Sequence, residues 1–212
     1  MRRTTIRFAP SGAASLLAAL ADQSLIQRQP GIDGEYRYSM LETVREFGLE
    51  RLIAHDEYLG MRDAHADWCL AFAARAGPEL AGSDHVAWFN RVEAEIGNIR
   101  AAHEWLITAA DADRATLLGM RLSWFWQTAG YYQEGRALFT RLMAMPEVSA
   151  CPEALARILG TAGSLEHQLG NLDRARELVD RAHHIARESG DERGRRRRPA
   201  VQRRRGRLSR GG

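Results

Sequence analysis

The amino-acid sequence predicts a mainly α-helical fold, in which a small segment with a β-hairpin is followed by stacked helix pairs and a basic tail. Three observations lead to this prediction. Apolar residues recur at helical spacing through most of residues 41–188, a turn-rich cluster separates two short strand-like segments near residue 30, and the last 20 residues contain few apolar side chains. With 45% apolar residues among 212, the chain can build a core.

The first segment, residues 13–56, is predicted to hold a helix, a hairpin and a second helix. Residues 1–12 contain Pro10 and Gly12 and are expected to be irregular, and a helix follows over residues 13–21. Residues 24–28 and 36–40 are predicted strands, joined by the turn cluster Gln29-Pro-Gly-Ile-Asp-Gly34. This order of elements is typical of part of a winged helix.

The helix after the hairpin is predicted to begin with a capping box. Ser39 and Glu42 have the required spacing, so that the hydroxyl of Ser39 accepts from the backbone of Glu42 while the carboxylate reaches back. The helix is expected to bury an apolar stripe of six side chains. These are Leu41, Val44, Phe47, Leu49, Leu52 and Ile53.

Residues 57–190 are predicted to be helical throughout. One helix covers residues 58–76 and is ended by Gly77-Pro78, and Asp84 caps a second helix that continues past Leu106. Asp111 caps a third helix, which ends at Gly130 and pairs with a helix over residues 131–143. Two further helices cover residues 152–170 and 172–188.

The last two helices carry a repeat-like pattern. Each has an apolar face, and small residues such as Gly163 and Ala175 allow their axes to approach closely. The pattern recurs 40 residues upstream, where Gly130 matches Gly170 and Phe139 matches Val179. It resembles a loose tetratricopeptide repeat, which implies an α-solenoid.

The tetratricopeptide pattern implies a groove for a protein or peptide partner along the first helix of the last pair, and the alternative is a solvated helix face. The residues that would line it are Arg157, Gly160, Ser164, His167 and Gln168.

Residues 191–212 form a separate basic tail. They carry a net charge of +8, whereas residues 1–190 carry −5, and the segment is expected to be disordered because it has too little apolar surface to offset the entropy of ordering. Arginine-rich segments bind phosphate backbones, and a solvated tail or an out-of-register translation are the alternatives. The candidate nucleic-acid contacts are Arg195, Arg196, Arg197, Arg198, Arg203, Arg204 and Arg205.

Composition argues against several classes of protein. All 30 basic residues are arginine, so the lysine of a phosphate-binding loop, a Schiff-base enzyme or a kinase is missing. Cys69 and Cys151 do not make a disulfide framework, and no apolar run reaches the length of a membrane span. We therefore expect a cytoplasmic protein that is not an enzyme, and binds no metal.

Three other clusters have a functional and a structural interpretation. His65 and Cys69 have a spacing that suits two metal ligands, although a buried cysteine beside a histidine is the simpler interpretation. His167, His183 and His184 are expected at the surface. The aromatic group of Trp124, Phe125, Trp126, Tyr131 and Tyr132 suits a ligand cage or, more simply, core packing.

Several strings resemble the part of STAND (NB-ARC-type) ATPase regulators that follows the nucleotide-binding core, as found in bacterial LuxR-type and antibiotic-regulatory transcription factors. They are Leu16-Leu-Ala-Ala-Leu-Ala-Asp-Gln-Ser-Leu-Ile26, Tyr36-Arg-Tyr-Ser-Met-Leu-Glu-Thr-Val-Arg-Glu-Phe47, Glu93-Ala-Glu-Ile-Gly-Asn-Ile-Arg-Ala-Ala102 and Trp124-Phe-Trp-Gln-Thr-Ala-Gly-Tyr-Tyr-Gln-Glu-Gly-Arg136. The resemblance implies ATP or ADP only in a complete parent protein. Leu41 stands where many relatives have a phosphate-contacting histidine, and we expect it in the core instead.

The sequence therefore predicts a regulatory protein-interaction segment, similar to the sensor half of such a regulator and lacking its ATPase core. Contact with DNA is expected to be indirect or weak, through the tail, and contact with membranes is not expected. Exposed solenoid ends predict self-association. The alternative function is nucleic-acid binding by the tail and the winged helix.

Overall fold

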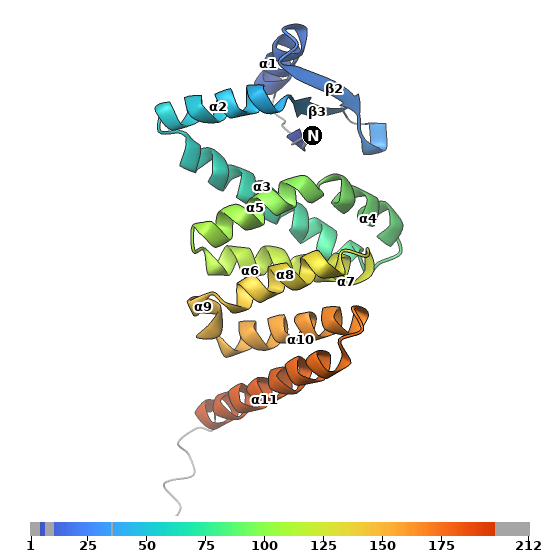
Figure 1. Cartoon of the computed structure of the whole chain (residues 1–212), viewed down its shortest axis with the longest axis vertical. Coiled ribbons are helices and arrows are strands. Elements are labelled where there is room, and N and C mark those ends of the chain that lie inside the picture. Colours follow the sequence, from blue (N-terminus) through green and yellow to red (C-terminus); the bar gives the residue numbers. More distant parts are fainter. Residues whose placement is uncertain (1–4, 7–10, 35, 198–212) are drawn as a thin grey trace, which may run out of the picture.

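The computed structural model describes residues 5–6, 11–34 and 36–197, and it is mainly helical with a small antiparallel sheet. The elements are piled in chain order along the long axis of the molecule, with the sheet at one end and the last helix at the other (Figure 1). This arrangement confirms the predicted fold class.

The N-terminal unit consists of α1 (Ser11–Asp22), η1 (Ile32–Gly34), α2 (Glu42–Ala54) and a sheet with the strand order β1-β3-β2. Its strands are β1 (Thr5–Ile6), β2 (Ile26–Pro30) and β3 (Tyr36–Met40). The predicted hairpin is confirmed, with Ile26 opposite Met40. The prediction of irregular structure before residue 13 is wrong for β1 and for the start of α1, because a two-residue strand is too short to show an alternating pattern.

The predicted capping box does not form. Ser39 is buried in β3, where its hydroxyl accepts a hydrogen bond from Gln29 Nε2 at 3.4 Å, so its side chain is not available to α2. Leu41, in extended conformation, occupies the N-cap position without a side-chain hydrogen bond. Glu42 instead pairs with Arg45 one turn later.

The remaining helices form the stack. They are α3 (Tyr58–Glu79), α4 (His85–Ala94), α5 (Ile96–Thr108), α6 (Ala112–Arg121), α7 (Ser123–Thr128), α8 (Tyr132–Met143), α9 (Pro146–Ser149), α10 (Pro152–Gln168) and α11 (Leu172–Arg197). The cap at Asp111 is confirmed, because its carboxylate accepts from the backbone of Arg114 at 3.1 Å. Gly130 and Gly170 both have a φ of +81°, which explains glycine at these turns.

Three predicted boundaries are wrong. Helix α3 continues through Gly77 and Pro78 to Glu79, although proline cannot donate the helical hydrogen bond at its own position. The helix predicted after Asp84 is divided into α4 and α5 at Glu95, whose N–H is shared by the carbonyls of Arg91 and Val92. The helix predicted after Asp111 is divided into α6 and α7 at Leu122.

Helix α11 also differs from its prediction, because it continues beyond residue 188 to Arg197. Residues 191–197 are therefore helical and not disordered, since extending an existing helix with arginine costs little compared with starting one. The side chains of Arg195, Arg196 and Arg197, and the whole of residues 198–212 with Arg198 and Arg203 to Arg205, lie outside the described part of the chain.

The two predicted helix hairpins lie next to each other. Helix α10 packs against α11 on one side and against α7 and α8 on the other. Leu118, Phe139, Ile158 and Leu165 have no exposed surface, so the faces of both hairpins meet in one core. Side chains that are only partly buried, including Trp88 and Trp105, surround this core.

We predict that the close approach of α10 and α11 makes Gly163 sensitive to substitution. A Cβ at this position would lie 2.8 Å from Val179 Cγ2 and 3.2 Å from the carbonyl oxygen of Ala175, so Gly163→Ala is expected to lower the free energy of unfolding by about 1–3 kcal/mol. Urea denaturation measures this change. The control is Gly160→Ala on the same helix, where nothing lies within 4 Å, and it is expected to stabilise slightly through helix propensity.

Candidate functional site

Three of the five predicted groove residues come together in one hollow, and Gly160 lines neither of the two hollows described below. Ser164, His167 and Gln168 line an open depression of about 630 Å³ where the C-terminal half of α10 meets α7 and the start of α11. We call it the α10 hollow. Its other lining residues are Gln127, Gly163, Leu172, Ala175, Arg176 and Val179.

Arg157 lies in a second, smaller depression of about 240 Å³ between α6, α9 and α10, which also contains Cys151. We call it the α9 hollow. Arg157 and Ser164 are two helical turns apart and therefore lie on the same face of α10. The residues of the predicted groove are thus divided between two hollows, with Arg157 in the α9 hollow and Ser164, His167 and Gln168 in the α10 hollow.

The α10 hollow combines an apolar floor with hydrogen-bonding groups at its rim. Leu172 and Val179 contribute apolar surface, and Leu172 is 57% exposed. The hydroxyl of Ser164 donates to the carbonyl of Gly160 at 3.2 Å, which leaves its lone pairs for an incoming donor. Arg176 is well exposed and lies 3.8 Å from Asp173, so its guanidinium remains accessible to an acidic group. Such a surface suits a polypeptide with polar and apolar side chains.

The aromatic group is part of the core. Phe125 and Trp126 are buried, and the ring of Tyr131 stacks on Phe125 with centroids 5.3 Å apart. Trp126 meets Tyr131 edge to face at 6.2 Å. Trp124 points elsewhere and is 49% exposed, so these rings do not form a cage.

His65 and Cys69 are adjacent, with 3.9 Å between Nε2 and Sγ. Cys69 is completely buried, its thiol donates to the carbonyl of Asn98 at 3.6 Å, and burial raises the pKa of the thiol to about 12. Burial also lowers the pKa of His65. Within the described residues no group of three or more histidine, cysteine or carboxylate side chains could hold a metal ion. His167, His183 and His184 are exposed, as expected.

A polar junction joins the N-terminal unit to the stack. Arg37 on β3 donates to the carboxylate of Glu95 at 2.8 Å and to the carbonyl of Ala94 at 2.6 Å. Glu95 is 4% exposed at the break between α4 and α5, and its second oxygen accepts from Asn98 at 2.7 Å. The sequence analysis did not pair these residues, although a glutamate inside an apolar helical stripe was a signal for a buried partner.

Leu41 stands where many STAND regulators have a histidine that contacts the nucleotide, but this residue does not suit that role. The prediction that Leu41 is in the core is wrong, because its side chain is 48% exposed at the start of α2. Leucine has no hydrogen-bond donor, so a nucleotide phosphate gains no contact from this side chain. The neighbouring Glu42 carries a negative charge and is paired with Arg45. These residues do not fit ATP or ADP.

Comparison with known proteins relates the chain to transcriptional regulators. Proteins of Mycobacterium tuberculosis and Mycobacterium bovis, each named "Putative HTH-type transcriptional regulator", are 32% identical to it over 127 residues. The match covers 60% of this chain and 14% of each relative, so the chain spans about one seventh of their length. No family model matches the sequence, and no solved structure is significantly similar. Among the described helices, none has the length and apolar character needed to cross a bilayer.

We predict that acid destabilises the stack through His103. This ring is buried in α5, and burial lowers its pKa from the ordinary 6.5 to about 4. Between these values the unfolded chain binds a proton that the folded chain excludes, so stability falls as the pH decreases through this window, by up to about 3 kcal/mol. Chemical denaturation at pH 7 and pH 4 measures the loss. His103→Leu should reduce it, whereas His183→Leu, at an exposed position, should not.

We also predict that Arg37 holds the N-terminal unit against the stack. Arg37→Met leaves the buried Glu95 without its cation, which costs about 3 kcal/mol. Hydrogen exchange should therefore become faster in β2, β3 and α2 and stay unchanged in α10 and α11. The control is Arg45→Met, which removes an exposed pair worth at most about 1 kcal/mol. Equal effects of the two variants would contradict this role for Arg37.

Proposed function

We propose that this chain is a regulatory, partner-binding segment of a transcription regulator of the STAND type. In this proposal the helical stack is a tetratricopeptide-like sensor that binds a protein or peptide in the α10 hollow. The N-terminal unit corresponds to the winged helix of such regulators. The observation that carries the proposal is the match to HTH-type transcriptional regulators over 127 residues, together with the two adjacent helix hairpins that frame the hollow.

The segment acts by binding and not by catalysis. Cys69 is the thiol closest to a histidine side chain, and burial raises its pKa so far that the reactive thiolate is not populated near neutral pH. The α10 hollow offers hydrogen-bonding and apolar groups, which suit recognition. A cytoplasmic location accords with a role in transcription.

The signal is transmitted as a shift between docked and released states of the segment. A partner in the α10 hollow contacts α7, α10 and α11 at once and therefore favours one spacing of these helices. The stack continues from these helices to the junction of Arg37 and Glu95, which fixes the N-terminal unit. A partner that binds one spacing of the helices more tightly therefore shifts the equilibrium between the docked and the released state of the segment.

We predict that substitutions in the α10 hollow abolish peptide binding. Peptides selected from a random display library on the full chain should lose affinity about tenfold or more when Arg176→Glu and Ser164→Glu are combined, because the rim becomes acidic and more crowded. Fluorescence anisotropy of labelled peptides measures the affinity. The control Arg187→Glu changes an exposed arginine of α11 that lies outside the hollow. Peptides that bind both variants equally well would contradict the proposal.

The same peptides and binding assay, applied to a truncated chain, test the alternative function of nucleic-acid binding. A chain that ends at Gly194 lacks all the candidate nucleic-acid contacts, from Arg195 to Arg205, and shortens α11 only by its last three residues. If the chain acts through peptides, this truncation leaves peptide affinity unchanged. A salt-sensitive affinity for duplex DNA that disappears with the truncation, in a chain that binds no peptide, would support nucleic-acid binding instead.

A further inference from the structure

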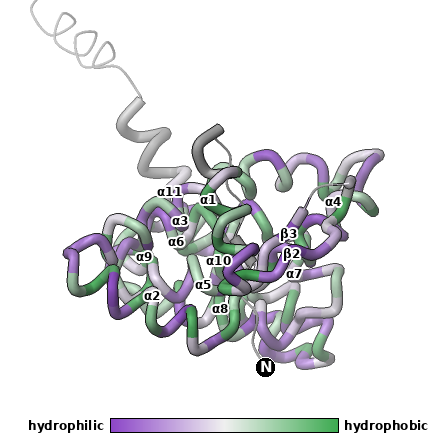
Figure 2. The backbone as a smooth tube through the Cα atoms, turned by 90° about the horizontal axis from the view of Figure 1, so that it is seen from above, coloured by the Kyte–Doolittle hydropathy of each residue, from purple (hydrophilic) through white to green (hydrophobic). Residues whose placement is uncertain are grey.

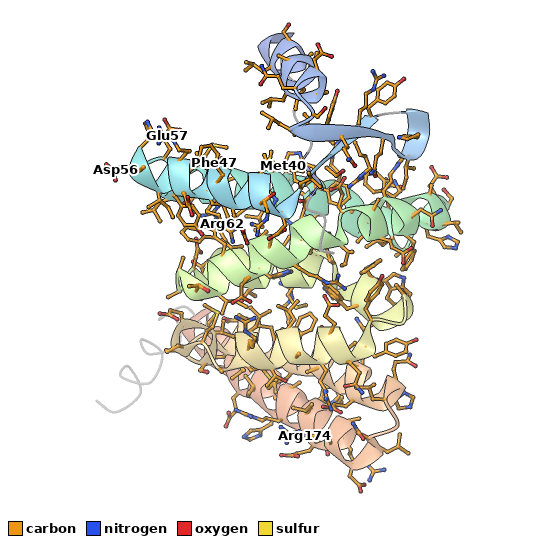
Figure 3. The ribbon with its side chains drawn as sticks, turned by 45° about the horizontal axis from the view of Figure 1, so that its top comes forward. Met40, Phe47, Asp56, Glu57, Arg62 and Arg174 are labelled. Carbon is orange, nitrogen blue, oxygen red and sulfur yellow. The ribbon has the colours of Figure 1, made fainter. Side chains whose placement is uncertain are left out.

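The exposed apolar side chains are concentrated at the N-terminal end of the molecule. Eight of the twelve large apolar side chains that are exposed among the described residues lie between Leu16 and Met61. At the other end, Leu172 is the exposed large apolar side chain among the described side chains of α11. The surface of this helix also carries the charged Arg174, labelled in Figure 3, which pairs with the exposed Glu177. The two ends of the molecule therefore differ in how much apolar surface they expose.

Helix α2 accounts for much of this difference. None of its residues is buried, and Phe47 and Ile53 are 63% and 60% exposed. Its apolar residues surround the helix instead of forming one stripe: Val44, Leu49 and Leu52 are half-buried, while Phe47 and Ile53 face outward. Two large apolar side chains exposed on one side of a helix form a patch that a partner can cover. In Figure 1, α2 lies across the end of the stack, and Figure 2 shows the hydropathy along its tube.

The exposed side of α2 has a definite chemical character. Six exposed residues recur at the spacing of one helical face, and we call them the α2 outer face. They are Thr43, Glu46, Phe47, Glu50, Ile53 and Ala54. The face contains two carboxylates and no basic residue, and the exposed Asp56 and Glu57 extend the acidic character at the end of the helix (Figure 3). Of the nearby arginines, Arg45 pairs with Glu42, and Arg51 lies at the edge of the face.

We propose that the α2 outer face docks a protein helix whose apolar stripe is flanked by lysine or arginine. Phe47 and Ile53 supply the apolar contact, and Glu46 and Glu50 select a basic partner through charge complementarity. A second copy of the chain is a poor occupant, because pairing two such faces brings four carboxylates together, and the nearby arginines are Arg45, which is paired with Glu42, and Arg51 at the edge of the face. Helix α11, which residues 198–212 follow in the sequence, lies at the opposite end of the stack (Figure 1). The proposal is independent of the α10 hollow.

The test uses two synthetic helical peptides of about 18 residues, which is about five turns. One peptide has leucine at helical spacing with lysine at all other positions, and the other has glutamate in place of lysine. Fluorescence anisotropy with the full chain at about 0.15 M salt should show at least tenfold tighter binding of the lysine peptide. Phe47→Ser combined with Ile53→Ser should abolish this binding. Glu46→Arg combined with Glu50→Arg should reverse the preference.

Leu172→Ser is the matched control, because it removes an exposed leucine from the far end of the molecule. It should leave both affinities unchanged, and thermal denaturation verifies that every variant is folded. Equal binding of the two peptides, or an equal loss in the Leu172→Ser variant, would overturn the proposal. It would also be overturned by a dimer that Phe47→Ser dissociates, or by peptide binding that requires removal of residues 198–212, since another copy or the tail would then be the occupant.

Discussion

The close spacing between neighbouring helices depends on glycines at the helix contacts. Gly163 faces Val179 and the Ala175 carbonyl, and a Cβ at Gly135 would meet Trp126 Cβ at 3.0 Å. A Cβ at Gly77 would lie 2.8 Å from the carbonyl oxygen of Arg121. These three glycines lie at three different helix contacts along the stack. Because protein interiors are close-packed, a larger residue at any of them would push two helices apart and disturb the core on both sides.

The N-terminal unit is held by a different kind of interaction. Ion pairing and hydrogen bonding between Arg37, Glu95 and Asn98 fix its sheet to the break between α4 and α5, whereas the helices of the stack share an apolar core. A buried carboxylate is stable only while its partners remain in place. The two parts are therefore expected to respond differently to solvent and to substitution.

Much of the stack could be predicted from the sequence, because its signals are local and repeated. The cap at Asp111, the turns at Gly130 and Gly170 and the pairing of α10 with α11 each follow from a pattern of a few residues. The errors have a common origin in contacts between distant residues.

The capping box was wrong because the hydroxyl of Ser39 is engaged within the sheet, where it accepts from Gln29. The helix break at Glu95 is the place where Arg37, 58 residues earlier, binds the carboxylate of Glu95 and the carbonyl of Ala94, and such a contact leaves no local pattern in the sequence. The exposure of Leu41, Phe47 and Ile53 could not be predicted either, since apolar spacing does not show whether a neighbour is present. The division of the candidate groove into two hollows could not be predicted, because α9 lines one of them and packs there through contacts that the α10 pattern does not contain.

The contrast between the two cysteines has a practical consequence for studies in solution. Cys69 is sealed in the core, while Cys151 is exposed beside the α9 hollow, and the sequence contains no lysine amines to compete for an electrophile. A maleimide dye or spin label would therefore attach at one chosen point without any engineering. That point directly precedes α10 and lines the α9 hollow, so the label becomes a built-in reporter of events in the α9 hollow.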